Sequence, residues 1–197
     1  MKITKVRGTQ DKLDLSLHNF LTDKIKAQMA LYNYSQIETP IIEPQALICR
    51  SLGQETDVVT KEMFNVVASG DEKICLRPEA TASTMRAYLE SGISEKPWRV
   101  FSYGPMFRHE RPQKGRWRQF DQFNIELING SSIAHDAEFL LMLDQLFTEK
   151  LLVEDYVLSI NFLGTLEERN NYKIKLVEFL NQNSTGNEEN SICQTCT

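Results

Sequence analysis

Two runs of strand-forming residues lie on either side of a short turn, and together they limit the fold more than any other feature. Residues 98–108 read WRVFSYGPMFR and residues 116–128 read RWRQFDQFNIELI, both rich in aromatic and β-branched residues. Pro112 and Gly115 between them are typical of a loop that reverses the chain. The segment therefore predicts a long hairpin at the centre of a sheet.

Side chains along the second of these strands alternate between two faces. One face carries Phe123, Ile125 and Leu127, which are suited to pack on helices. The other face carries, in order, Arg116, Arg118, Phe120, Gln122, Asn124, Glu126 and Ile128. A plain surface strand would also give such a polar row. The cations that precede the row favour a binding function.

The rest of the chain has both helix and strand patterns. Apolar residues at intervals of four predict a helix within 14–34, with Lys24, Lys26 and Gln28 on its exposed side. Further helices are expected at 47–52, 78–92 and 134–152. Strands joined by hairpin-type turns and flanked by helices indicate an α+β fold with a mainly antiparallel sheet.

Four shorter strands and one more helix complete the expected fold. The strands are expected at 32–44, 57–67, 73–78 and 156–164. Pro40 and Pro44 interrupt or bend the first of them. Thr165 and Glu168 have the spacing of a capping box, which predicts a helix over 165–183.

Five cations are crowded into one short stretch of a chain whose formal net charge is −5, namely Arg108, Arg111, Lys114, Arg116 and Arg118. Arginine presents planar pairs of donors that match phosphate or carboxylate oxygens. Beyond the cations, Phe120 offers a ring on which a nucleobase can stack. Gln122 and Glu126 offer polar groups to a small cationic ligand. The row therefore has the order needed to hold a nucleotide triphosphate beside a second, small substrate.

Two glutamates each have two interpretations. Glu110 lies among the arginines, where it is either an ion-pair partner or an acceptor for a nucleobase amino group. Glu79 and Thr81 lie in LRPEATAS at the beginning of a predicted helix, where a carboxylate is favoured by the helix dipole. Alternatively, Glu79 faces the same pocket as Glu126, and the two carboxylates bind a ligand with N–H donors or a positive charge.

The composition argues against several other classes of protein. The pI near 5.3 disfavours a broad basic surface for nucleic acid. The N-terminus has no apolar signal segment, and no apolar run approaches the ~18 residues that a membrane span needs. Cys49 and Cys75 fit small buried thiols, and the CxxC pair Cys193 and Cys196 has no second pair of ligands, so no metal site is expected. A reducing cytoplasm fits these cysteines best.

Several segments, in the same order, resemble the histidyl-tRNA synthetase family. FRHERPQKGRWRQF resembles motif 2 of class II aminoacyl-tRNA synthetases in the form typical of that family. LRPEATAS resembles the family's histidine-binding segment, and YNYSQIETPIIEP resembles motif 1, with Pro40 as the motif proline. VRGTQD and DVVTKEMF also fit. The similarity runs from about Val6 to Asn181.

This resemblance implies a class II synthetase-like antiparallel sheet flanked by helices, and the activity of a cytoplasmic histidine–tRNA ligase. With ATP and Mg²⁺, such an enzyme converts histidine to histidyl-adenylate and then transfers the histidyl group to tRNA(His). Stabilisation is expected to be mainly electrostatic, with Arg108 holding the α-phosphate and the histidine carboxylate. His109 has the opposite strand parity to Arg108, so it is not expected to act as a base.

The resemblance also implies a role for individual residues. ATP is expected to contact Arg108, Glu110, Arg116 and Phe120. The histidine substrate is expected to contact Glu79, Thr81, Gln122 and Glu126. The acceptor end of the tRNA is expected to contact Arg111, Gln113 and Lys114. The strand around Pro40 is expected at the contact of a homodimer.

The chain also departs from the family pattern. Residues 1–165 are expected to form the N-terminal part of a class II catalytic domain, with motifs 1 and 2, and residues 166–197 the start of an insertion. Motif 3 and an anticodon-binding domain are not found, so the sheet is expected to be incomplete at the C-terminus and the chain inactive alone. Ala80 replaces a usual glycine. Asp121 replaces an aromatic residue or histidine and is expected on the packing face, away from the substrate.

Two other functions compete with the ligase. One is a synthetase-like regulatory subunit that binds histidine without charging tRNA, but such a subunit has no need for the cations of the hairpin. The other is a general nucleic-acid-binding module that uses the arginine hairpin, and the acidic remainder of the chain disfavours it.

Overall fold

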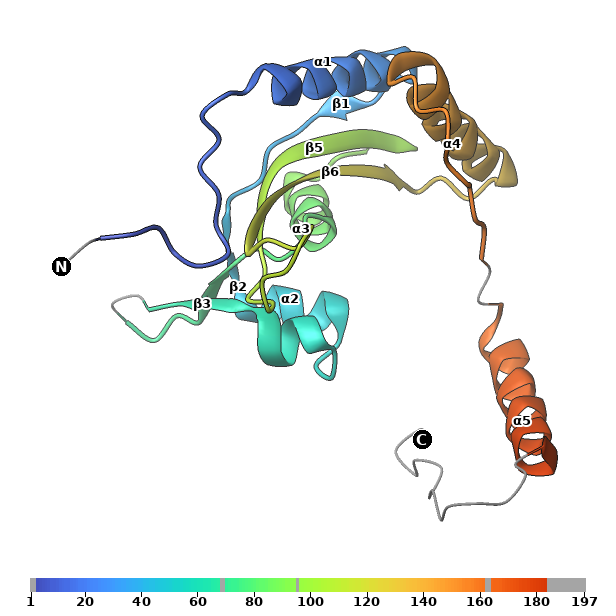
Figure 1. The fold of residues 1–197 in the computed structure, drawn as a ribbon. Coiled ribbons are helices and arrows are strands. Elements are labelled where there is room, and N and C mark those ends of the chain that lie inside the picture. Colours follow the sequence, from blue (N-terminus) through green and yellow to red (C-terminus); the bar gives the residue numbers. More distant parts are fainter. Residues whose placement is uncertain (1–2, 68–69, 95, 162–163, 184–197) are drawn as a thin grey trace. The chain divides into compact units, whose positions relative to one another are not determined.

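The computed structural model describes residues 3–67, 70–94, 96–161 and 164–183 (Figure 1). The chain falls into two compact units, Met1–Glu154 and Asp155–Thr197. The first unit contains two three-stranded sheets with their helices, and all the predicted site residues.

The larger sheet is built on the hairpin that the sequence predicts. Strand β5, Trp98–Phe107, pairs antiparallel with β6, Gln119–Ile128, over the full length of both strands. Strand β1, Ser35–Gln36, lies on the other side of β5 and runs parallel to it. β6 begins later than predicted because Arg116 belongs to the turn of the hairpin, where it forms an isolated bridge with Gln113.

One face of this sheet is covered by helices, as the alternation in β6 predicts. Helix α1, Ser16–Leu31, and helix α4, Ile133–Gln145, lie over it, and α4 continues into the short π-helical turn η2, Leu146–Lys150 (Figure 1). Phe123 and Ile125 of β6 pack there. The buried cluster that they contact is made of Met29, Tyr34, Phe101 and Met142. Burial of these apolar side chains fixes which face of β6 points toward the helices.

The opposite face of the sheet points toward helix α3, Thr81–Ser91 (Figure 1). Trp98, Val100 and Ile128 are buried there, with Tyr88 of α3 packed against them. The helix ends at Gly92 in a left-handed conformation, as the sequence predicts. The polar row of β6 therefore faces α3, and the N-terminus of α3 carries Glu79 and Thr81.

The smaller sheet has the strand order β2-β4-β3 and is antiparallel throughout. Its strands are β2, Ile42–Pro44, β4, Ile74–Leu76, and β3, Phe64–Val66. Helix α2, Gln45–Leu52, packs on it through Ile48, which is buried with Cys75 and Ala82. Burial raises the pKa of the Cys75 thiol to about 11, in agreement with a buried structural cysteine.

Arg77 joins the two sheets. Its backbone N–H donates to the carbonyl of Ile41 at 2.9 Å, and its carbonyl accepts from Phe107 at 3.0 Å. The buried guanidinium donates to the carbonyl of Pro105 at 3.1 Å and to that of Thr39 at 2.8 Å. Burial lowers the pKa of this arginine. A Cβ on Gly104 would lie only 2.8 Å from Nη2 of Arg77, so glycine makes room for the guanidinium.

Two expectations about secondary structure and one about burial are wrong. Residues Val58–Glu62 form a π-helical turn, η1, before β3, because Thr60 bonds the carbonyl of Thr56 through both its N–H and its hydroxyl. Residues 156–161 have no strand among the described residues, since no neighbouring strand pairs with them. Gln28 is buried, because α4 packs on that side of α1 and the carbonyl of Met142 accepts its Nε2–H at 3.3 Å.

The second unit contains helix α5, Leu166–Asn183, and its capping box is confirmed. Thr165 donates its backbone N–H to Oε2 of Glu168 at 2.6 Å, and Oγ1 of Thr165 accepts from the N–H of Glu168 at 3.2 Å. Hydrogen bonds from the backbone and, next, the side chain of Thr165 lower the pKa of the Glu168 carboxyl group. Cys193 and Cys196 lie outside the described residues.

Candidate active site

A tight turn forms the tip of the arginine hairpin. Arg116 donates its backbone N–H to the carbonyl of Gln113 at 2.9 Å. Gly115 has a φ of +80°, which a residue with a side chain rarely adopts. Arg111, Gln113 and Lys114, the residues predicted to contact tRNA, are all exposed here. The tip therefore presents two cations and an amide at the surface.

The N-terminal segment closes the base of the hairpin. Arg118 donates its backbone N–H to the carbonyl of Gly8 at 2.7 Å and Nη1 to the carbonyl of Arg7 at 3.3 Å. Gly8 has a φ of +86°, and a Cβ there would lie 2.9 Å from side-chain carbons of Arg118 and Pro112. The glycine of VRGTQD was the one sequence signal for this close approach, and reasoning from the residues missed it.

The four residues predicted to contact ATP line one cavity of about 490 Å³. They are Arg108, Glu110, Arg116 and Phe120, and Gly115, Trp117 and Asp121 complete the lining. The guanidinium of Arg108 lies 5.3 Å from the centroid of the Phe120 ring, within the range of a cation–π contact. Nε of Arg108 also donates to the carbonyl of Pro78 at 3.0 Å. Arg108 therefore connects this cavity to the segment that contains Glu79.

Glu110 is an ion-pair partner in this structure. Its Oε2 accepts from Nη1 of Arg116 at 3.3 Å, as the ion-pair interpretation predicts. The contact with a nucleobase amino group stays a prediction. The arginine is largely exposed, and such a pair contributes little to stability, about 0–1 kcal/mol. The pair places one carboxylate and one guanidinium at the wall of the 490 Å³ cavity.

Glu79 caps the N-terminus of α3. Its two carboxylate oxygens accept the backbone N–H groups of Thr81 at 2.6 Å and of Ala82 at 2.9 Å. The side chain is buried, with 8% of the residue exposed. The capping interpretation is therefore confirmed. Ala80 beside it is fully buried with a negative φ of −109°, so the backbone tolerates alanine there.

Asn124 links the N-terminus of α3 to the polar row of β6. Its Oδ1 accepts from the hydroxyl of Thr81 at 3.3 Å, and its Nδ2 donates to Oε1 of Glu126 at 3.2 Å. Gln122 lies two residues before Asn124 and so points to the same face. The structure thus brings Glu79, Thr81 and Glu126 together through a residue that the sequence reasoning left without a role.

His109 lies on the side of the hairpin away from the cavity. It donates its backbone N–H to the carbonyl of Glu62 at 2.6 Å, and its ring packs edge-on against Phe64 with 5.2 Å between centroids. These contacts tie the hairpin to the smaller sheet and give the imidazole a packing role.

Asp121 has the strand parity of Phe123, as the sequence predicts, and it also reaches the cavity of the predicted ATP residues. Asp121 lines the 490 Å³ cavity because β6 has no further strand on that edge among the described residues, so residues of both parities reach the cavity there. Its carboxylate pairs with Nζ of Lys12. It also lines a second cavity of about 310 Å³ near His18, which hydrogen-bonds the hydroxyl of Tyr103. Burial and, next, the charge of Asp121 raise the pKa of Tyr103.

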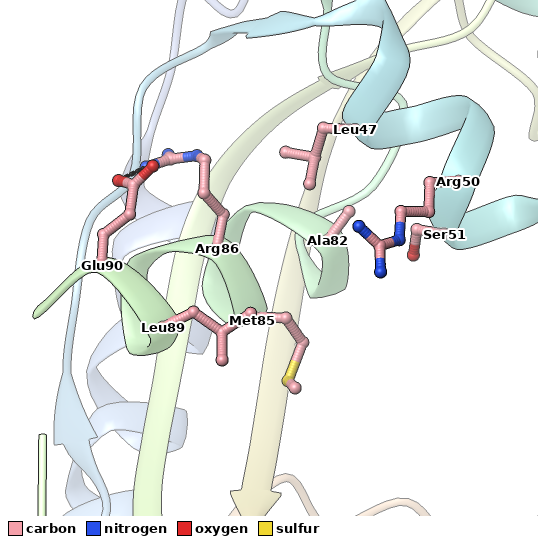
Figure 2. A pocket seen from close by; sticks show the side chains of 8 residues that line it. All are labelled: Leu47, Arg50, Ser51, Ala82, Met85, Arg86, Leu89 and Glu90. Carbon is pink, nitrogen blue, oxygen red and sulfur yellow. Dashed lines mark hydrogen bonds and ion pairs between the residues drawn. The ribbon is translucent and has the colours of Figure 1, made fainter. Parts of the chain in front are cut away.

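A third cavity, of about 430 Å³, is a mostly apolar groove between α2 and α3 (Figure 2). Leu47 points toward α3 from α2, and Arg86 pairs with Glu90 at 2.8 Å at one end of the groove (Figure 2). Arg86 also pairs with the buried carboxylate of Glu43 at 2.7 Å. None of the residues predicted to contact ATP or histidine lines this groove.

Pro40 lies between the two sheets in an exposed part of the first unit. Strands β1 and β2 stand before and after it and belong to different sheets, so the predicted break in the strand is confirmed. Ile41 and Ile42 beside it are 40% and 52% exposed. Pro40, Ile41 and Ile42 therefore leave apolar area exposed next to one another.

Neither a metal centre nor a membrane span is found within the described part of the chain. No three His, Cys, Asp or Glu side chains gather there in a way that would hold a metal ion. No described helix has the length and apolar character needed to cross a bilayer.

Comparisons with known proteins point to one family. The sequence profile described as "Histidyl-tRNA synthetase" matches residues 17–171. The chain is 45% identical over 180 residues to the chloroplastic histidine–tRNA ligase of Gracilaria tenuistipitata var. liui, a match that covers 90% of this chain and 43% of that protein. It is 42% identical over 196 residues to the histidine–tRNA ligase of Thermosipho melanesiensis, covering 98% and 45%. The chain thus spans less than half the length of these relatives.

Solved structures share the fold. The apo histidyl-tRNA synthetase of S. aureus superposes with a TM-score of 0.62 at 33% identity, over 75% of this chain and 39% of that chain. The pyrrolysyl-tRNA synthetase of Desulfitobacterium hafniense gives a TM-score of 0.61 at 19% identity, over 74% and 50%, which shows a common fold alone. The predicted α+β fold of the class II synthetases is confirmed.

Proposed function

The chain belongs to the histidyl-tRNA synthetase family, and on this premise we propose that it carries the ATP- and histidine-binding part of a histidine–tRNA ligase. The observation that carries the proposal is the position of Arg108. One side chain contacts Phe120 in the 490 Å³ cavity and the carbonyl of Pro78, the residue before Glu79. A reaction that joins a nucleotide to an amino acid needs a cation at the boundary of the two sites.

The proposed reaction has two steps. A carboxylate oxygen of histidine attacks the α-phosphorus of ATP, the bond to the bridging oxygen breaks, and pyrophosphate leaves. A hydroxyl of the terminal ribose of tRNA(His) then attacks the histidyl carbonyl, and AMP leaves. In both steps charge develops on phosphate or carbonyl oxygens, so fixed cations and oriented donors supply the stabilisation.

Within the cavity, Arg108 is proposed to hold the α-phosphate and the histidine carboxylate. Arg116 and Glu110 are proposed to contact the nucleotide, and Phe120 to stack on adenine. The shared cavity and the cation–π contact support this assignment. Asp121 also lines this cavity, and Lys12 pairs with its carboxylate. With Lys12 counted, the cations around the cavity outnumber the carboxylates.

The amino acid is proposed to bind between the N-terminus of α3 and β6. Glu79, Thr81, Gln122 and Glu126 are its proposed contacts. The hydrogen bonds from Thr81 through Asn124 to Glu126 support a common site. Glu79 already accepts two backbone N–H groups, so its remaining lone pairs would accept from the ligand.

Larger partners are proposed at two exposed places. Arg111, Gln113 and Lys114 at the hairpin tip would contact the acceptor end of tRNA, and the surface around Pro40 would contact a second copy of the chain. The proposed compartment is the cytoplasm, although one relative is named as chloroplastic.

Mg²⁺ would arrive with ATP. The described residues hold no three-ligand cluster, and the carboxylates of Glu110 and Asp121 at the cavity fit an ion that uses one or two carboxylates and keeps water and phosphate ligands. When bound, the ion would neutralise phosphate charge.

The test is histidine-dependent exchange of pyrophosphate into ATP by the whole protein that carries this chain. Arg108→Ala is expected to lower the exchange rate by at least about 100-fold, because it removes charge stabilisation at the α-phosphate. Histidine affinity, measured by equilibrium dialysis, is expected to fall much less than the exchange rate, because the proposed contacts at Glu79, Thr81, Gln122 and Glu126 remain.

The matched control is Arg50→Ala, which removes an exposed arginine on α2 outside the cavity and is expected to leave the exchange rate unchanged. Histidine binding by the unaltered protein without any exchange would reject the ligase and favour the regulatory subunit.

A further inference from the structure

We propose that Asn124 is a positioning residue that sets the orientation of Glu126 and Thr81 in the amino acid site. The inference rests on the proposed function for the identity of the ligand, and on two hydrogen bonds for the geometry. Asn124 accepts from Thr81 and donates to Glu126, so one side chain touches a contact residue on each of the two elements that enclose the site.

The location of Asn124 makes it a fixed point. It lies within β6 on the face toward α3 and is only 8% exposed. Its backbone is held in register with Ser102 of β5, which is itself buried. A short side chain on a central part of a paired strand has little freedom, whereas the longer Glu126 side chain has three rotatable bonds. Asn124 therefore restricts Glu126, and the reverse effect is small.

The two hydrogen bonds require an amide. The hydroxyl of Thr81 donates, so its partner must accept, while a carboxylate oxygen of Glu126 accepts, so its partner must donate. Asparagine offers both from one short side chain. Aspartate has no donor and would add a negative charge beside Glu126. Serine has both functions but is too short to reach both partners.

The arrangement forms a continuous chain of hydrogen bonds. Glu79 accepts the N–H of Thr81, the hydroxyl of Thr81 donates to Asn124, and Asn124 donates to Glu126. One oxygen of Glu126 is occupied in this way. No hydrogen bond from the described residues reaches its other oxygen, which is proposed to accept from an N–H group of the substrate. Asn124 thereby determines which carboxylate oxygen the amino acid meets.

The first experiment separates positioning from general stability. Asn124→Asp is made in the whole protein, and the KM for histidine and for ATP are measured by pyrophosphate exchange. The KM for histidine is expected to rise at least about tenfold, because the introduced carboxylate repels Glu126 and cannot donate to it. The KM for ATP is expected to change less than about twofold, since Asn124 does not line the 490 Å³ cavity. Equal changes in both constants, or no change, would overturn the inference.

One control variant and one alternative variant accompany this experiment. Asn129→Asp makes the same chemical change at an exposed position just after β6, where the amide donates to the hydroxyl of Tyr88, and is expected to leave both constants unchanged. If Asn124→Asp does not fold, Asn124→Ser shortens the side chain without adding charge, and the same selective rise in the KM for histidine is expected.

A double-mutant cycle tests the contact without any substrate. The loss of unfolding free energy is measured for Asn124→Ser, for Glu126→Gln and for both together. Non-additive losses are expected because the two side chains touch. Additive losses would overturn the inference even if the protein charges tRNA. Non-additive losses in a protein that shows no histidine-dependent exchange would instead reject the proposed function, and with it the role of Asn124 in that site.

Discussion

Arg77 holds a buried positive charge against backbone carbonyls from two segments that are far apart in sequence. No carboxylate lies within ion-pair distance of it among the described residues. Its guanidinium donates to the carbonyls of Thr39, Pro40 and Pro105 and to the hydroxyl of Thr39. A planar guanidinium can satisfy several acceptors at once, which the single ammonium of lysine cannot do. Arg77 is thus the residue that fixes the bend near Pro40 relative to β5 and to the segment of Glu79.

Gly8 supports the first prediction at the scale of the residue. Gly8→Ala introduces a Cβ 2.9 Å from side-chain carbons of Arg118 and Pro112, in a residue whose φ is +86°. Gly92→Ala also places a side chain on a residue with a positive φ, of +62°, but its Cβ would have no atom within 4 Å. We expect Gly8→Ala to lower the free energy of unfolding by about 1–2 kcal/mol more than Gly92→Ala. Urea unfolding measures both free energies of unfolding, provided that the two variants have the same dependence on urea concentration. Equal losses in the two variants would contradict the predicted clash.

The elements differ in how well the sequence predicts them, and the difference has a physical cause. The sequence predicts the two faces of β6 correctly. Phe123 and Ile125 pack against helices on one face, and Asn124 bonds to α3 on the other. Residues alternate along the strand because its two faces have different surroundings. The run 57–62 has no such alternation. Its β-branched residues suit a strand, but local bonds from Thr60 to Thr56 and the ion pair of Asp57 with Lys61 stabilise a helical turn.

The other differences between prediction and structure come from contacts between elements that are distant in sequence. Gln28 is buried, and the described residues 156–161 form no strand, contrary to both predictions. Burial and strand pairing depend on partners that lie far away in sequence. In the candidate site, the predicted ATP residues were brought to one cavity because strand parity and the hairpin determine their places. Asn124 and Gly8 could not be identified as site residues, because their roles depend on distances between α3, β6 and the N-terminal segment.

The capping box of α5 gives the prediction at the scale of the element. Glu168 accepts the N–H of Thr165, which lowers the pKa of its carboxyl group. The ionised form therefore stabilises the helix above the ordinary pKa of glutamate, about 4.3, and the effect is lost as the pH falls through the lowered value. A peptide of residues 164–183 should show helicity by circular dichroism that is steady from pH 7 to about 5 and falls below pH 4.

The matched peptide with Glu167→Gln keeps the capping box and should show the same fall. With Glu168→Gln, the helicity should be lower at pH 7 and nearly flat across this range. A fall of the same size in the Glu168→Gln peptide would show that other carboxylates cause it.

At the scale of the whole molecule, the exposed surface beside Pro40 is the place where a second copy is proposed to bind. Ile41→Glu puts a charge on that surface without removing a core contact, since 40% of the residue is exposed. We expect the whole protein to shift from dimer to monomer, with the dissociation constant raised at least about 100-fold because the charge loses its water in the interface. Sedimentation equilibrium measures the shift.

The control is Ile133→Glu at the start of α4, where the isoleucine is 86% exposed and distant in sequence from Pro40. It is expected to leave the oligomeric state unchanged. A dimer that persists in Ile41→Glu at low micromolar concentration would place the contact elsewhere.

The close approach of Gly104 to Arg77 ties two positions that are 27 residues apart in the chain. Neither residue can be replaced alone. A methyl group at position 104 would occupy the space of the Arg77 guanidinium. A smaller residue at position 77 would leave carbonyls without donors and a void beside Gly104. Among homologous sequences the two sites should therefore change together or not at all. A lineage that acquires a bulkier residue at 104 must also rebuild the joint between its two sheets.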